Sequence, residues 1–161
     1  HALVRRQRQM CIRDRSLSGL FMDSLYDSYV GAAPGDLSGT VPSNTPEDTI
    51  ASTITWNYNV SGWDSFIRVS HLYSSEAKLL ENPAHQALLV AQGNGFRKQD
   101  TLNFTAGFEK DNLSITLWGK NINDDEFLTS AFIAVADLSE TSFFGYPNNY
   151  KTYGLTLNYS F

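Results

Sequence analysis

The stretch Tyr150-Lys151-Thr152-Tyr153-Gly154-Leu155-Thr156-Leu157-Asn158-Tyr159-Ser160-Phe161 decides the fold. Every second residue in it is large and apolar: Tyr153, Leu155, Leu157, Tyr159 and Phe161. The residues between them are small or polar: Thr152, Gly154, Thr156, Asn158 and Ser160. Because side chains alternate between the two faces of a strand, this pattern predicts a β-strand with one apolar and one polar face.

Five earlier segments repeat the alternation, with the first of them the weakest. They span residues 20–29, 50–60, 65–73, 101–109 and 113–121. Trp118 is an exception, because it falls among the polar residues of its segment. Aromatic residues make up 13% of the chain, which suits strands since rings fit a pleated surface. The sequence therefore predicts an all-β fold of about six antiparallel strands.

Short and long connections alternate along the chain. Residues 60–64 and 109–112 are tight turns, whereas residues 31–49, 74–100 and 123–149 form long polar connections. This layout is typical of outer-membrane β-barrels, which have short periplasmic turns and long extracellular loops. It predicts a transmembrane β-barrel fragment whose last strand ends at Phe161 in the periplasm. No apolar run approaches the roughly 20 residues that a membrane-spanning helix needs.

The first fifteen residues differ from the rest. They hold five arginines, one acidic residue and Cys11, the only cysteine of the chain. The stretch from Gln9 to Arg15 resembles translated sequencing-adapter DNA. We therefore interpret residues 1–15 as a non-native leader and residues 16–161 as the C-terminal part of an outer-membrane β-barrel. The alternative is a basic arm that binds acidic lipid or nucleic acid.

Without the leader, the chain is acidic. It keeps 12 − 5 = 7 basic and 17 − 1 = 16 acidic residues, a net charge of −9, and no cysteine. Residues 16–161 therefore lack the excess of basic residues that nucleic-acid binding requires. Without cysteine they can form neither disulfide bonds nor a thiol-based site. We expect no cofactor.

No set of residues indicates catalysis, so we do not expect an enzyme. His71 and His85, the histidines outside the leader, fall on a strand and in a loop, and nothing selects a partner for either. The acidic residues 124–126 lack the ligand spacing of a calcium loop and are interpreted as a solvated loop start rather than a cation site. The last long connection carries aromatic residues that either contact a ligand or pack the loop: Phe132, Phe143, Phe144 and Tyr146.

Four stretches, in order, resemble one family. The segment from Tyr146 to Phe161 resembles the closing strand of TonB-dependent receptors, with a proline, then Tyr-Gly, then alternation up to a terminal aromatic. Residues 119–127 are similar to a conserved stretch of that family, although Asn123 replaces its usual Phe. Residues 36–47 resemble a loop before one of its strands, and residues 23–26 the strand preceding that loop.

The resemblance implies a receptor in the bacterial outer membrane that imports a bulky nutrient such as a siderophore, a cobalamin or an oligosaccharide. It implies a barrel of about 22 strands, an N-terminal plug and coupling to the TonB complex. Phe161 would help the barrel-assembly machinery to recognise the unfolded chain. The plug and coupling segments are not in this sequence, and six strands are fewer than the roughly eight of the smallest barrels, so we expect a fragment.

Two alternatives remain. One is a small outer-membrane barrel or the translocator end of a secretion system, which would need only about two further strands. The other is a soluble β-sandwich binding module, whose strands also alternate between apolar and polar faces. A sandwich does not predict the alternation of short and long connections, the terminal Phe161 or aromatic residues at the strand ends.

Overall fold

The computed structural model describes residues 13–31, 35–134 and 142–161. Its elements are, in chain order, β1 (Arg13–Phe21), β2 (Asp48–Val60), β3 (Trp63–Lys78), α1 (Pro83–Ala91), β4 (Phe96–Lys110), β5 (Leu113–Lys120), β6 (Leu128–Ile133), β7 (Phe143–Pro147) and β8 (Thr152–Tyr159). No helix in the described ranges is long and apolar enough to cross a membrane. Residues 1–12 of the leader lie outside the described residues.

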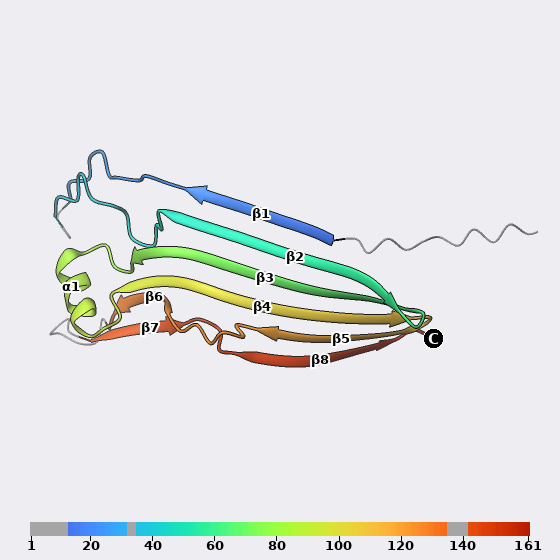
Figure 1. The fold of residues 1–161 in the computed structure, drawn as a ribbon. Coiled ribbons are helices and arrows are strands. Elements are labelled where there is room, and N and C mark those ends of the chain that lie inside the picture. The colour runs from blue at the N-terminus through green and yellow to red at the C-terminus, as the bar shows by residue number, and fades with distance from the viewer. Residues whose placement is uncertain (1–12, 32–34, 135–141) are drawn as a thin grey trace, which may run out of the picture.

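Six strands form one antiparallel sheet in the order β1-β2-β3-β4-β5-β8 (Figure 1). The other two, β6 and β7, pair with each other in a separate hairpin inserted between β5 and β8. The prediction of an all-β, antiparallel fold is therefore confirmed. Within the described part of the chain the sheet is open, with β1 and β8 at its edges, and no closed barrel is formed.

Strand pairing aligns the alternating residues of neighbouring strands. One row of directly paired residues, from β2 to β8, is apolar: Trp56, Ile67, Ala106, Leu117 and Leu155. The row beside it is mostly polar: Thr55, Arg68, Thr105, Trp118 and Gly154. Because directly paired residues share a face, the sheet has an apolar face and a polar face, as the alternation predicts.

The tight turns and the long connections lie at opposite ends of the sheet (Figure 1). Ser61 and Gly62 join β2 to β3, and both have left-handed backbone angles, with φ of 52° and 82°. Left-handed residues give two-residue hairpins a twist that matches the strands. Asp111, with φ of 51°, begins the turn from β4 to β5. The C-terminus lies at this turn end, so the predicted layout of connections is confirmed.

The prediction of a strand at residues 20–29 is wrong. The strand is β1, which ends at Phe21, and the chain then enters a loop that bonds to residues 37–40. Tyr26 donates its backbone N–H to the carbonyl of Thr40 at 3.0 Å and accepts one from Gly39 at 2.7 Å. Because the loop satisfies its own backbone groups and buries Leu37, it does not need the sheet.

Two long connections also hold more structure than predicted. Between residues 74 and 100, β3 continues to Lys78, β4 begins at Phe96, and α1 lies between them. Asn82 caps this helix by accepting the backbone N–H of Ala84 at 2.9 Å. Between residues 123 and 149, the apolar residues of β6 and β7 pair as a hairpin instead of remaining a polar loop.

The buried apolar residues gather under the long connections, away from the middle of the sheet. Five of the six in the described ranges belong to these connections or to the strand ends beside them: Leu37, Ala77, Leu79, Leu89 and Ala134. Ala106 is the exception in mid-sheet. Helix α1 and the β6–β7 hairpin also lie at the long-connection end (Figure 1). The described protein therefore places no second layer over the length of the sheet.

Candidate functional site

The apolar face of the sheet is largely exposed. Leu155 and Leu157 on β8 are 57% and 62% exposed, and Ile54 on β2 is 56% exposed. Other large side chains that pairing places on this face and that are exposed are Leu17, Phe21, Trp56, Val60, Val69, Leu117, Tyr153 and Tyr159. Apolar patches larger than a few hundred Å² are rare on soluble monomers and mark contact surfaces.

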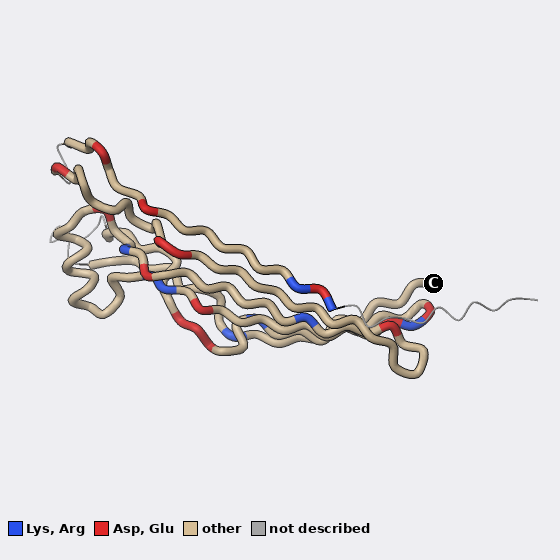
Figure 2. The backbone as a smooth tube through the Cα atoms, turned by 45° about the horizontal axis from the view of Figure 1, so that its top comes forward, with Lys and Arg blue, Asp and Glu red and all other residues tan. Residues whose placement is uncertain are grey.

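Charged residues are scarce along the middle of the sheet and more frequent toward its ends (Figure 2). On the apolar face, Asp100 and Lys110 lie beyond the apolar run of β4. Arg13 and Arg15 of β1 interrupt the face, since they pair with Trp56 and Ile54. Both arginines belong to the segment interpreted as non-native, whose boundary after residue 15 falls inside β1.

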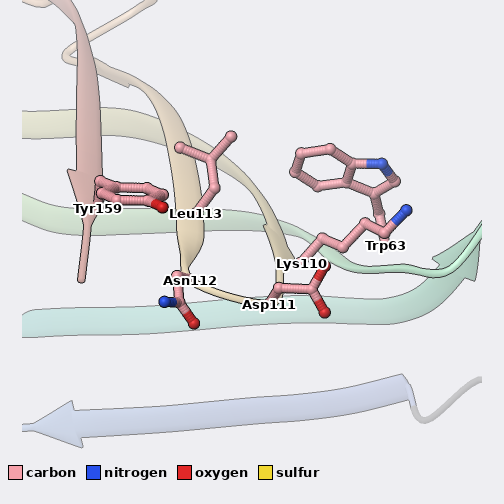
Figure 3. Close-up of a pocket in the computed structure, with 6 residues that line it drawn as sticks. All are labelled: Trp63, Lys110, Asp111, Asn112, Leu113 and Tyr159. Carbon is pink, nitrogen blue, oxygen red and sulfur yellow. The ribbon is translucent and has the colours of Figure 1, made fainter. Parts of the chain in front are cut away.

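Aromatic side chains border the apolar face at the turn end. Trp63 and Tyr159 lie with Leu113 on one side of the sheet, next to the turn residues, around a hollow of about 500 Å³ (Figure 3). Phe161 follows β8, is fully exposed, and contacts the ring of Tyr159 edge-on at a centroid distance of 5.2 Å. Asn112 holds this terminus by donating its side-chain amide to the carbonyl of Ser160 at 2.9 Å.

Trp118, the exception to the alternation, covers a glycine on the polar face. It is paired directly with Gly154, and a Cβ added to that glycine would overlap the indole ring. The indole N–H donates to the hydroxyl of Thr156 at 3.3 Å. Phe66 covers Gly107 in the same manner. Aromatic rings on the polar face thus fill the space that strand glycines leave open.

The four aromatic residues singled out in the last connection divide between the two faces of the β6–β7 hairpin. Phe132, Phe144 and Tyr146 form one exposed cluster, with ring centroids 5.5 Å apart between the first two and 5.8 Å between Phe132 and Tyr146. Phe143 is only partly exposed and lines a hollow of about 230 Å³ together with Leu89 of α1. The structure therefore brings three of the four rings together, and Phe144 of that cluster also lines the hollow beside Phe143.

Asn121 links the segment that enters the β6–β7 hairpin, at Asp125, to the segment that leaves it, at Asn149. It is 2% exposed, and its amide donates to the carbonyls of Asp125 at 2.8 Å and Asn149 at 3.0 Å. Its side-chain oxygen accepts the backbone N–H of Asp125 at 2.9 Å. Asn148 adds a parallel bridge, since it donates to Asp125 and accepts the backbone N–H of Phe127. The hairpin is therefore anchored by the buried amide of Asn121 and the half-buried amide of Asn148.

Two side chains from the segment after β5, those of Asn123 and Asp125, bond to the backbone at the edge of β4 where a neighbouring strand is missing. β5 pairs with β4 only as far as Phe104, which leaves the backbone of residues 100–102 without a neighbouring strand on that side. Asn123 accepts the N–H of Leu102 at 2.9 Å and donates to the carbonyl of Asp100. Asp125 accepts the N–H of Asp100 at 2.6 Å. An amide and a carboxylate thus satisfy the β4 edge and fix the turn against it.

Two of the acidic residues 124–126 have partners within the protein. Asp124 pairs with Lys151 at 3.1 Å, and Asp125 is used by the backbone of β4. His71 lies 2.6 Å from the carboxylate of Asp100, with no third ligand grouped beside them. Among the described residues no cluster of three or more His, Cys, Asp or Glu side chains is placed to hold a metal ion.

Glu81 anchors the connection between β1 and β2 to the end of β3. Its carboxylate accepts the backbone N–H of Ser43 at 2.7 Å and lies 3.3 Å from the ammonium group of Lys78. Burial raises the pKa of Glu81, but the hydrogen bond from Ser43 and the charge of Lys78 outweigh it, so that the pKa is lower than usual. The ionised carboxylate is therefore the form that holds this connection.

Sequence reasoning missed the structural importance of Asn121 and Asn148, because an asparagine in a polar stretch has no periodic signal.

In comparisons with known proteins, no family model and no curated protein matches the sequence, and no solved structure matches the fold. The fold and the exposed faces define the class directly: an antiparallel β-sheet protein with one apolar face, one polar face and an anchored aromatic hairpin.

Proposed function

We propose that this chain forms part of the wall of an outer-membrane β-barrel, in a TonB-dependent receptor that imports a bulky nutrient. The observation that carries the proposal is the exposed apolar face, which continues across the strands of the sheet and is backed by a polar face. In such barrels the outward face is apolar and meets lipid, while the inward face is polar.

The dimensions of the apolar face suit a membrane. On β2 the apolar face extends from Ile50 to Val60, interrupted only by Ser52, and ten steps of about 3.4 Å give roughly 34 Å. At the tilt of about 45° that membrane strands have, this length spans roughly 24 Å of the membrane normal. The apolar band of outer-membrane barrels is roughly 25 Å tall. Trp63, Tyr159 and Phe161 border one end of the face, where amphipathic rings favour the boundary between lipid and water.

A soluble β-sandwich is less well supported. Its apolar face would be covered by a second sheet about 10 Å away. The second sheet in the described residues, β6–β7, lies at the long-connection end, and Leu117 on β5 and Leu155 and Leu157 on the edge strand β8 stay exposed. The cost of leaving this surface in water is avoided if lipid acyl chains cover it.

The receptor assignment rests on the resemblance of the four sequence stretches and adds partners to the proposal. Outer-membrane lipid covers the apolar face, and the barrel-assembly machinery recognises the strand that ends at Phe161. The long-connection end faces outward and meets the ligand, so Phe132, Phe144 and Tyr146 are the ligand-contacting candidates that remain on an open surface. The TonB complex acts through an N-terminal plug segment.

Tryptophan fluorescence tests the lipid contact, because the chain has three tryptophans and they lie on different faces. Trp56 lies on the apolar face and Trp118 on the polar face. In the whole barrel read from the source genome, variants keep one of these tryptophans and carry Phe at every other tryptophan position, and they are folded into vesicles of lipid brominated on the acyl chain. We expect strong quenching of Trp56 and little quenching of Trp118.

Equal quenching of both tryptophans, or none of either, contradicts the proposal. A chain that remains in solution without detergent and is not quenched supports the sandwich instead. The reading frame upstream of Ser16 in the source genome separates the two membrane alternatives. A frame that continues through further hairpins to a plug-like segment supports the receptor, whereas a signal peptide within about a hundred residues supports a small barrel.

A further inference from the structure

The polar face carries a hollow of about 530 Å³ beneath the β6–β7 hairpin. Its floor comes from alternate residues of β4, and its walls come from the end of β5 and from the two bases of the hairpin. The polar side chains that contribute most of its hydrogen-bonding groups are Arg97, Gln99, Thr101, Asn103, Lys120 and Asn149. A hollow of this size is within the range of small-molecule sites.

The alternation of β4 explains why these groups converge. Arg97, Gln99, Thr101 and Asn103 are spaced two residues apart, so they project from the same face of the strand. Lys120 belongs to the same face of the sheet, since it pairs with Thr152 of β8. β5 ends at Lys120, and Lys120 and the following Asn121 form one wall of the hollow.

The charge of the hollow is opposite to that of the chain. Residues 16–161 hold seven basic residues and sixteen acidic ones, yet two of those seven, Arg97 and Lys120, line this one hollow. None of the described residues that line it carries a carboxylate. Asp125 lies at its rim near Thr101, and its carboxylate accepts the backbone N–H of Asp100 at 2.6 Å.

We propose that this hollow binds an anionic, oxygen-rich solute, such as a sugar phosphate or a polyhydroxy carboxylate. Arg97 and Lys120 would pair with the oxyanion, and the amides of Gln99 and Asn103 would bond to hydroxyl groups. The inference deepens the proposed function by naming the chemistry of a ligand on the polar face. The inference rests on the proposed function in one respect: a barrel would give solutes access to the polar face.

Binding is tested by calorimetry on the full chain folded in a zwitterionic detergent. The probes are glucose 6-phosphate and glucose, which differ only in the anionic group. We expect binding of the phosphate ester and none of the neutral sugar. Arg97→Gln and Lys120→Gln each weaken binding about tenfold or more, the scale of one charge-assisted hydrogen bond.

Two further variants separate the site from its surroundings. Lys110→Gln removes the same charge at the turn end of the sheet, and we expect it to bind glucose 6-phosphate like the parent chain. Arg97→Lys keeps the charge and should retain part of the affinity. Equal affinity for glucose, or binding that survives both Arg97→Gln and Lys120→Gln, overturns the proposal. So does an absence of binding to a folded chain, even when the bromolipid experiment succeeds.

Discussion

Replacing Asn121 should detach the β6–β7 hairpin from the sheet. Its side chain makes three hydrogen bonds at 2.8, 2.9 and 3.0 Å, and Asn121→Ala removes all of them. At about 1 kcal/mol for each bond, the loss is about 3 kcal/mol. Alanine adds about 1 kcal/mol of strain, because residue 121 has a left-handed φ of 50°. Asn121→Gly removes the same bonds without that strain.

Hydrogen exchange of the full chain in detergent measures this effect locally. A loss of about 3 kcal/mol corresponds to more than a hundredfold faster exchange at the amides of Asp125 and Phe127, since about 1.4 kcal/mol is a factor of ten. We expect Asn121→Gly to exchange about fivefold more slowly than Asn121→Ala, in line with about 1 kcal/mol of strain. Asn112→Ala, which removes one exposed hydrogen bond at the turn end, is the control.

Exchange at these amides that changes by less than about threefold, or a uniform acceleration across the sheet, would refute the reasoning. The first outcome would mean that Asn148 alone holds the hairpin. The second would mean that the Asn121 network belongs to the cooperative unit of the whole sheet rather than to the hairpin.

Two further changes have signs that the structure fixes. Gly154→Ala should lower the free energy of unfolding by about 1–3 kcal/mol, because the new methyl group meets the Trp118 ring. In a Trp118→Ala background the same change should be neutral or stabilising by about 0.5–1 kcal/mol, since alanine is preferred to glycine in a strand. Urea unfolding followed by circular dichroism measures both, and a cost that persists without Trp118 contradicts the overlap. The folded protein holds the pKa of Glu81 below the ordinary glutamate value of about 4.3. The ionised carboxylate therefore contributes fully to the free energy of unfolding above that value, and this contribution is lost as the pH falls through the lowered pKa of the folded state. After correction for intrinsic rates, the amide of Ser43 should lose protection over that window, whereas in Glu81→Gln it should be weakly protected at every pH.

Much of the sheet was predictable because its signal is periodic. The alternation in residues 150–161 and in the central segments separates an apolar face from a polar face, and strand pairing keeps that separation across the sheet. The turns at Ser61-Gly62 and at Asp111-Asn112 were predictable because few residue types accept left-handed angles.

The elements that the sequence did not predict depend on contacts with distant residues. β1 was placed too late, because the loop that follows it is stabilised by bonds to residues 37–40 that no local pattern reveals. The β6–β7 hairpin was missed because the apolar residues of Leu128–Ile133 and Phe143–Pro147 do not alternate with polar ones, and because no local pattern reveals the side-chain bonds from Asn121 and Asn148 at its base. Trp118 broke the alternation for a reason that lies on β8, in Gly154.

A membrane location places a strict requirement on the two edges of the sheet. β1 pairs only with β2, and β8 only with β5, so each edge strand carries a row of backbone groups without a strand partner in the described protein. In hydrocarbon each unpaired group costs several kcal/mol, which no contact of the apolar face with lipid offsets over a whole strand. If lipid covers Leu155 and Leu157, further strands must therefore pair with β1 and β8. The hollow lined by Arg97 and Lys120 would then face the enclosed interior, where a solute on the polar face meets protein on several sides.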